Sequence, residues 1–363
     1  MSNWPDWLPL RSALTGLTPY GAPQISDVIQ LNTNENPFAL PDSLVREMLA
    51  ALEGKLRTLN RYPDRDAVAL RTSLATYINT LSGTSFSSAN IWAANGSNEI
   101  LQTIMLAMGE RGALGFLPSY SVHPLIAQVT NTPWHSGSRR ADFSLDTESA
   151  VSQILSIKPA LTFITTPNNP TGSAITISEV EQLAQATAEV SGLLIVDEAY
   201  AEFSSEISAV TLLDRFPNIV VVRTMSKAFA FAGARVGYLV ARSEIINAAL
   251  VTRLPYHLST QTQTIAEVAL ENSDLLLAGV RQLISERDRV AAGLTALGFA
   301  VLPSAANFLM FTGMKQSPSE LWQALVDRRV LIRDIGIPGY LRVSIGTPDE
   351  NDQFLAEIAS FTS

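Results

Sequence analysis

Short apolar segments recur through the middle of the chain, and each is followed by a polar connection and then by a helical pattern. Segments of this kind are typical of strands that are buried on both faces. Their alternation with helices predicts an α/β fold, in which helices cover a mainly parallel sheet. Right-handed crossovers would bring the carboxyl ends of the strands to one edge of that sheet. The expected strands are residues 91–94, 113–117, 161–165, 193–197 and 219–222.

The pattern changes in the last third of the chain. A long helical pattern over residues 266–297 is followed by short strand candidates and two further helices. This order predicts a smaller α+β domain. The first residues are irregular and rich in proline and asparagine. We therefore expect an N-terminal arm over residues 1–40, a large domain over 41–258 and a small domain over 259–363, with the arm joining the small domain.

Composition excludes several classes of function. The net charge of −9 argues against nucleic-acid binding, which needs a basic surface. The chain has no cysteine and only three histidines, none of them at metal-ligand spacing, so we expect neither disulfides nor a metal site. The N-terminus lacks a signal-peptide pattern, and no apolar run is long enough to span a membrane. We expect a cytoplasmic protein.

One lysine stands out just after the strand at residues 219–222. Lys227 lies among small and apolar residues, and burial would lower the pKa of its amine and make it a nucleophile. Ser226 and Arg235 could bind a phosphate beside it. This combination suggests a Schiff base between Lys227 and a phosphorylated aldehyde. The alternative is a strand-end lysine that reaches solvent and an arginine that pairs on the surface.

Polar side chains also follow each of the other expected strands. Any one of them could be an ordinary cap or turn residue. Ser97 and Asn98 open a helix, where free N–H groups could bind phosphate. Asp197 could pair with a protonated ring nitrogen, and an aromatic side chain could stack on the ring. The remaining candidates are Tyr120 for stacking, and Asn169 and Tyr200 for a ring oxygen.

The acidic strand end at Asp197 and Glu198 also suggests an ATPase, but the chain contains no phosphate-binding G-x-x-x-x-G-K-[ST] motif. The candidates instead recur on successive connections between strands and helices. They would therefore meet at one edge of the sheet.

With these residues the chain resembles the fold-type-I pyridoxal-phosphate aminotransferases, and more narrowly the histidinol-phosphate aminotransferases. The resemblance covers almost the whole chain. The Asn-Pro-Thr-Gly motif, the aspartate and the lysine are typical of the superfamily, whereas other motifs point to the narrower family. The matching segments are residues 17–20, 34–37, 60–63, 166–172, 196–200, 224–238 and 341–347.

The resemblance implies roles for the matching residues and a homodimer. Lys227 would hold the pyridoxal 5′-phosphate cofactor and carry the proton between the substrate Cα and the cofactor, while Asp197 holds the ring nitrogen. Asn169 and Tyr200 would bind the ring oxygen. Tyr62 would reach the cofactor phosphate of the neighbouring subunit. The implied phosphate and stacking residues are Ser97, Asn98, Ser226, Arg235 and Tyr120.

The resemblance also implies residues that bind substrate. Arg342 and Arg333 would bind the anionic groups of substrates, because a guanidinium accepts either a carboxylate or a phosphate. For Arg333 the alternative is a surface pair with Asp334. Many relatives carry a basic residue soon after the Pro-Tyr pair at Tyr20, whereas here an uncharged segment follows. The other implied substrate-binding residues are Tyr20, Asn36, Tyr62 and Tyr256.

The implied reaction is amino transfer between L-histidinol phosphate and 2-oxoglutarate, which gives imidazole acetol phosphate and L-glutamate in histidine biosynthesis. Three alternatives remain open at this point. The same residues would serve an aromatic amino-acid aminotransferase with a different pocket, or a phosphothreonine-type decarboxylase. A non-catalytic aminotransferase-like module of a regulator is the third, although the acidic charge and the intact lysine argue against it.

Overall fold

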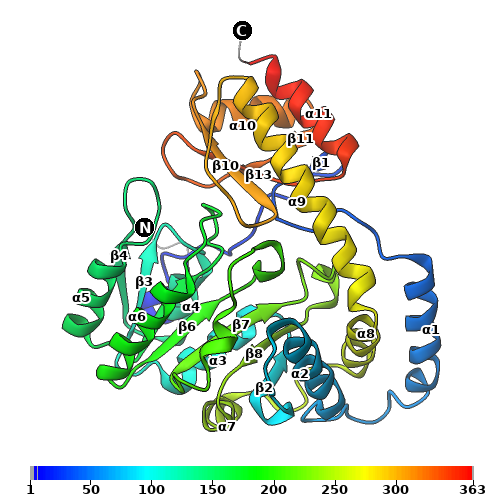
Figure 1. Ribbon diagram of the computed structural model, residues 1–363, viewed down its shortest axis with the longest axis vertical. Helices are drawn as coiled ribbons and strands as arrows, with labels where there is room; N and C mark the ends of the chain where they lie inside the picture. The colour runs from blue at the N-terminus through cyan, green and yellow to red at the C-terminus, as the bar shows by residue number, and fades with distance from the viewer. Residues whose placement is uncertain (1–3, 6, 362–363) are drawn as a thin grey trace.

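A seven-stranded sheet forms the centre of the larger, lower part of the molecule (Figure 1). The computed structural model describes residues 4–5 and 7–361. Strand order is β2-β8-β7-β6-β5-β3-β4, and among these strands only β8 runs antiparallel to its neighbours. The strands are β2 (Ile91–Ala94), β3 (Ala113–Leu117), β4 (Trp134–Ser138), β5 (Leu161–Thr165), β6 (Leu193–Asp197), β7 (Ile219–Thr224) and β8 (Gly237–Val240).

Both faces of this sheet are buried, which explains why its central strands are apolar without alternation. In β7, Ile219 and Val221 pack into one hydrophobic cluster while Val220 and Val222 pack into the other. The same division holds in β2. The covering helices are α1 (Asp42–Leu56), α2 (Val68–Ser82), α3 (Ser97–Met108), α4 (Val122–Thr130), α5 (Thr147–Ile157), α6 (Ile177–Glu189), α7 (Ser243–Thr252) and α8 (Thr260–Glu271).

The smaller, upper part contains a four-stranded antiparallel sheet of order β12-β13-β10-β9 (Figure 1). The long helix α9 (Ser273–Ala296) joins the two parts. These observations confirm the predicted α/β class with a smaller α+β part. The strands are β9 (Ala300–Val301), β10 (Phe308–Thr312), β12 (Arg333–Asp334) and β13 (Leu341–Ser344), and the helices are α10 (Pro318–Asp327) and α11 (Pro348–Ala359).

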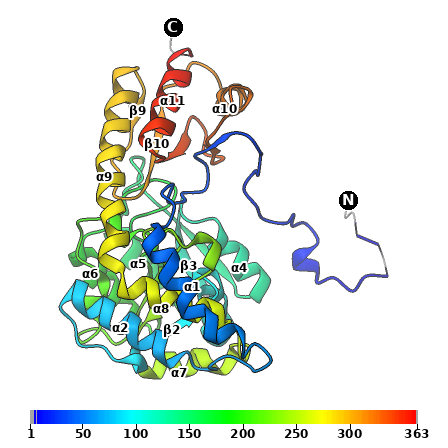
Figure 2. The same ribbon diagram turned by 90° about the vertical axis from the view of Figure 1, so that its right-hand side faces the viewer.

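The N-terminal arm connects to both parts. Its strand β1 (Ile29–Gln30) pairs in parallel with β11 (Val330–Leu331) of the small part. Further towards the N-terminus the arm runs outward along the molecule (Figure 2). There the short 3₁₀ helix η1 (Ser12–Leu14) packs against α4, and the Gln128 side chain donates to the Ala13 carbonyl. The arm therefore passes the carboxyl edge of the large sheet on its way to α1.

None of the described helices is both long enough and apolar enough to cross a membrane. The described residues also contain no group of three histidine, aspartate or glutamate side chains that could hold a metal ion.

Candidate active site

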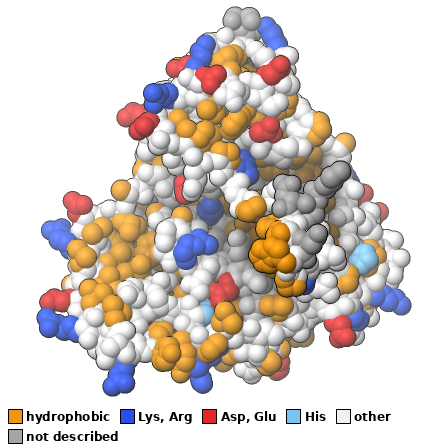
Figure 3. Space-filling view, turned by 180° about the vertical axis from the view of Figure 1, so that it is seen from behind, with side chains coloured by type: hydrophobic (Ala, Val, Ile, Leu, Met, Phe, Trp, Pro, Cys, Tyr) orange, Lys and Arg blue, Asp and Glu red, His pale blue; other side chains and the backbone are white. Residues whose placement is uncertain are grey.

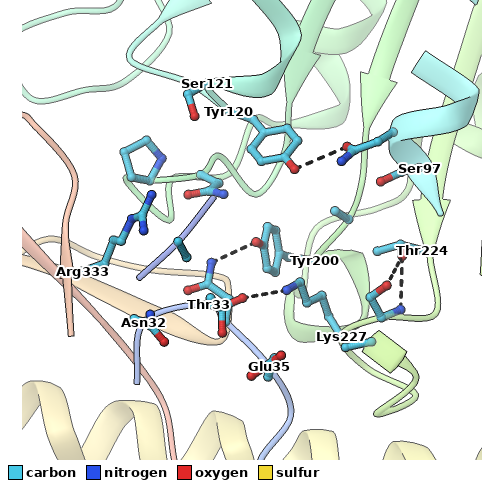
Figure 4. Close-up of a pocket in the computed structure, with 18 of the residues that line it drawn as sticks. Asn32, Thr33, Glu35, Ser97, Tyr120, Ser121, Tyr200, Thr224, Lys227 and Arg333 are labelled. Carbon is cyan, nitrogen blue, oxygen red and sulfur yellow. Dashed lines mark hydrogen bonds between the residues drawn. The ribbon is translucent and has the colours of Figure 1, made fainter. Parts of the chain in front are cut away.

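A cavity of about 770 Å³ opens where the carboxyl ends of β2, β5, β6 and β7 meet the arm and the small sheet. The residues labelled in Figure 4 come from the arm, from the ends of β2, β3, β6 and β7 and the connections after them, and from the small sheet. In the space-filling view, basic side chains lie around the hollow below the upper part of the molecule (Figure 3). Most of the lining residues belong to the connections that follow the strands and to the arm, and the strand ends place them around the cavity.

One end of the cavity is suited to a phosphate. Gly96 has a φ of 83° and precedes α3, whose first N–H groups have no partner within the helix. A Cβ placed on Gly96 would lie 2.7 Å from Arg235 Nη2, so the guanidinium covers this turn closely. Ser97, Ser226 and Arg235 all line this end. The dipole of α3, the hydroxyl groups and the guanidinium together favour a bound dianion.

Asp197 ends β6 at the floor of the cavity and is 2% exposed. Behind it, His123 Nε2 donates a hydrogen bond to Asp197 Oδ2 at 3.0 Å. The backbone N–H of Ala199 donates to the other carboxylate oxygen at 3.3 Å. These two bonds hold the carboxylate in one orientation, and an acid held in this way can pair with a cationic ring nitrogen.

Aromatic and amide groups lie above this floor. The Tyr120 ring lies edge-on to His123, and its hydroxyl donates to Asn98 Oδ1 at 3.3 Å. Tyr200 is 4% exposed, and its hydroxyl accepts a hydrogen bond from Asn34 Nδ2 at 2.9 Å. Burial raises the pKa of Tyr200, so the hydroxyl keeps its proton at neutral pH.

Lys227 follows β7 by three residues, and its Nζ donates to the Thr33 carbonyl at 2.9 Å (Figure 4). Burial lowers the pKa of the amine from 10.5 to about 8, and the positive charge of Arg342 adds to this effect. Glu35 opposes the shift. The amine therefore loses its proton more readily than an ordinary lysine, as a nucleophile or base requires.

The small sheet contributes two arginines from neighbouring strands, Arg333 and Arg342. Arg342 is 7% exposed and binds only neutral acceptors, Asn169 Oδ1 at 2.6 Å and the Asn32 carbonyl at 2.7 Å. Burial lowers the pKa of Arg342 to about 10, and Arg333 contributes to this shift. Neither arginine forms an ion pair with any described residue, Asp334 included. The upper wall therefore carries uncompensated positive charge.

Most of the residues singled out in the sequence line this one cavity. They are Tyr20, Ser97, Asn98, Tyr120, Asn169, Asp197, Tyr200, Ser226, Lys227, Arg235, Arg333 and Arg342. Three others lie elsewhere. Asn36 lines a neighbouring cavity of about 320 Å³ and donates to the Ala228 carbonyl. Tyr62 and Tyr256 stack on each other at the surface, with ring centroids 4.4 Å apart. The roles proposed for individual residues stay predictions.

Three residues of the site were not predicted. His123 follows Tyr120 by three residues, and its place on the apolar face of α4 was the only available signal. Asn34 belongs to the matching segment 34–37 and Thr33 directly precedes it, but their contacts with Tyr200 and Lys227 span 166 and 194 residues of sequence. No local pattern reports contacts over such separations.

The cavity fits pyridoxal phosphate. The turn at Gly96 offers a phosphate seat, with a backbone conformation that favours glycine and with the Arg235 guanidinium close by. Asp197 lies at the floor of the cavity, where it could pair with the ring nitrogen, and Lys227 supplies an amine of lowered pKa. Because Arg342 occupies the oxygen of the Asn169 amide, the nitrogen of that amide is free to donate to a ring oxygen.

Known proteins resemble the chain over nearly its full length. The sequence profile of aminotransferase class I and II matches residues 26–358. A histidinol-phosphate aminotransferase of Nocardia farcinica is 52% identical over 353 residues, which are 96% of this chain and 91% of that protein. One of Mycolicibacterium smegmatis is 52% identical over 352 residues, which are 96% and 92% of the two chains.

A solved structure with a similar fold contains a cofactor. The structure of histidinol-phosphate aminotransferase from Sinorhizobium meliloti in complex with pyridoxal-5′-phosphate has a TM-score of 0.80 and is 26% identical. The match covers 92% of this chain and 90% of that one.

Proposed function

The chain belongs to the class I and II aminotransferases, and on this premise we propose that it is a histidinol-phosphate aminotransferase. It transfers an amino group between L-histidinol phosphate and 2-oxoglutarate, giving imidazole acetol phosphate and L-glutamate in histidine biosynthesis. The close relatives that carry this name match almost the whole chain. The cofactor is pyridoxal 5′-phosphate, for which the cavity is suited and which the Sinorhizobium meliloti structure contains.

One observation in the site carries this proposal. A lysine of lowered pKa lies in the same cavity as two arginines that have no carboxylate partner among the described residues. The lysine suits covalent and acid–base chemistry. The arginines suit substrates that bring an anion, and a guanidinium accepts the phosphate of histidinol phosphate as well as the carboxylates of glutamate.

Bound pyridoxal phosphate supplies an aldehyde that condenses with amines and a ring that accepts electrons. The residues of the chain bind, orient and move protons. Lys227 Nζ takes the proton from the substrate Cα, and general acid–base catalysis of this kind contributes on the order of 10²–10⁴-fold. Asp197 keeps the ring nitrogen protonated, while Arg342 and Arg333 hold the substrate anion so that its Cα faces Lys227.

The proposal includes a cytoplasmic homodimer in which Tyr62 reaches the partner's cofactor phosphate. Tyr62 is 79% exposed, so a second copy could cover it without rearrangement. Exposed apolar side chains close in sequence to Tyr62, or to Tyr256, which stacks on it, suggest an interface rather than free surface. They are Leu59, Val251 and Leu254.

Replacement of the lysine tests the proposal. Lys227→Ala should abolish both turnover and the visible absorbance band of the bound cofactor. Wild-type protein should use L-histidinol phosphate far better than L-phenylalanine with 2-oxoglutarate. Retained transamination in Lys227→Ala would exclude the catalytic role, and a preference for phenylalanine would move the assignment to an aromatic amino-acid aminotransferase.

A further inference from the structure

The arm segment around Asn34 joins the small sheet to the hydroxyl of Tyr200. Asn34 is 2% exposed and has a φ of 55°, a left-handed conformation that asparagine tolerates better than most residues. Its Nδ2 donates to Tyr200 Oη at 2.9 Å, and its Oδ1 accepts from Ser344 Oγ at 2.9 Å. Asn307 Nδ2 donates to the Asn34 carbonyl at 3.1 Å and holds the backbone in place.

The hydrogen bonds of Ser344 indicate which end of the Asn34 amide donates and which accepts. The backbone N–H of Asn34 donates to Ser344 Oγ at 2.8 Å, so the serine hydroxyl has its own proton left to give. That proton goes to Asn34 Oδ1. The amide oxygen therefore faces Ser344, and the amide NH₂ faces Tyr200.

The orientation of the Asn34 amide determines where the hydroxyl proton of Tyr200 points. Because Tyr200 Oη accepts from Asn34, its own hydrogen points away from Asn34, and the residue lines the cofactor cavity. The Tyr200 ring is held edge-on against Phe308, with centroids 5.2 Å apart. A hydroxyl held in this way has its proton free to donate towards the cavity.

We propose that Asn34 and Ser344 are positioning residues that hold Tyr200 as a hydrogen-bond donor to the ring oxygen of the cofactor. This inference rests on the proposed cofactor and is independent of the substrate. Ser344 lies two residues after Arg342 on β13, so both side chains are on the same face of that strand. Strand β13 thus carries both the arginine proposed to bind substrate and the serine that orients Tyr200 through Asn34. In this way it links substrate binding to the electronic state of the cofactor.

Asn34→Asp tests the direction of the hydrogen bonds with almost no change in size. The new carboxylate accepts from both Ser344 and Tyr200, and it turns the Tyr200 proton away from the ring. A donor on a negatively charged ring oxygen favours the proton-poor form of the bound chromophore. We therefore expect the pH midpoint of the holoenzyme's absorbance change to rise by about 1–2 units, which corresponds to one lost hydrogen bond to a charged oxygen.

The new carboxylate could also shift the midpoint through its charge alone. Making the same substitution in a Tyr200→Phe protein distinguishes that effect from the loss of the Tyr200 donor. In Tyr200→Phe, Asn34→Asp should move the midpoint much less than in wild type, because the donor is already missing. Ser344→Ala introduces no charge, releases the amide of Asn34 and should shift the midpoint in the same direction by a smaller amount. Asn351→Asp makes the same exchange at another buried asparagine of the small part, whose side-chain bonds go to Gly346 and Glu286 and not to Tyr200, and should leave the midpoint unchanged.

An unchanged midpoint in Asn34→Asp, or an equal shift in both backgrounds, would overturn the inference while leaving the proposed function intact. If Asn34→Asp does not fold, an unchanged midpoint in Ser344→Ala decides against the inference in the same way. Wild-type protein that shows no visible band with pyridoxal phosphate would instead overturn the proposed function, and the inference with it.

Discussion

Two buried arginines of this protein are stabilised in opposite ways. Arg223 ends β7 behind the cavity and is 3% exposed, while Arg342 lies in the cavity wall and is 7% exposed. Arg223 forms ion pairs with Glu198 at 2.7 Å and with Glu202 at 3.3 Å. Arg342 has only neutral oxygen acceptors and lies over the Phe308 ring at 5.1 Å.

The two environments shift the pKa values in opposite directions. The carboxylates of Glu198 and Glu202 raise the pKa of Arg223 despite its burial. Burial without a carboxylate lowers the pKa of Arg342 to about 10. A buried charge without a partner is costly, so a fold retains one where a ligand will supply the opposite charge. The difference separates an arginine that is paired within the fold from one that we propose binds the substrate anion.

The largest effect is expected from Arg223→Leu, which would leave two carboxylates buried without their cation. Removing one member of a buried pair costs about 3–5 kcal/mol of unfolding free energy. The loss should be smaller at low pH, where the carboxylates take up protons. Urea unfolding of the cofactor-free protein measures both effects, and a stability equal to that of wild type at neutral pH would break the comparison.

Arg342→Leu makes the same exchange at the other arginine, with the opposite expectation. It removes an unpaired buried charge, so the unfolding midpoint should stay equal or rise. The substrate anion would lose its buried partner, which costs about 2–5 kcal/mol, or roughly 30- to 5,000-fold in kcat/KM. Steady-state rates with histidinol phosphate measure this loss. A variant that loses stability but keeps its rate would assign Arg342 to the fold.

The sequence predicted the buried central strands better than the other strands of the large sheet. Strands β2, β3, β5 and β6 have the predicted bounds, because each is a continuous apolar run buried on both faces. The edge strand β4 is largely polar and was missed, and so was β8, which lies within the glycine-containing segment after Lys227. Residues at strand ends could be placed at one edge from topology alone.

Contacts between distant segments could not be predicted in this way. Arg342 was assigned through resemblance, and nothing in its own strand indicates that Asn32 and Asn169 are its partners. The same holds for Asn34 and Tyr200. Their positions depend on how the arm packs between the two parts of the molecule, and this packing leaves no periodic pattern in the sequence.

Lys227 provides a third case, a buried cation without a carboxylate hydrogen-bond partner whose pKa falls from 10.5 to about 8. Between these pH values the unfolded chain binds more protons than the folded one, so stability should rise with pH across this window. At pH 7, Lys227→Met should stabilise the cofactor-free protein by about 1–3 kcal/mol, because the cost of the buried charge disappears. This gain should vanish by the pKa of the unfolded lysine.

Unfolding at several pH values measures the difference between the two proteins. A gain that is independent of pH would mean that packing of the methionine, and not removal of the charge, stabilises the variant. Ionisation of Lys227 would then not contribute to the pH dependence of stability between about pH 8 and pH 10.5.

The smallest effect is expected at an exposed arginine that is paired. Arg215 donates to Glu181 Oε1 at 2.6 Å, and the two side chains are 63% and 32% exposed. If pairing alone determined the cost of losing an arginine, Arg215→Leu would resemble Arg223→Leu. Water solvates the remaining carboxylate at this position, so we expect a change of less than about 1 kcal/mol in urea unfolding. A loss as large as that of Arg223→Leu would show that pairing and not burial sets the cost, and the distinction between Arg223 and Arg342 would then fail.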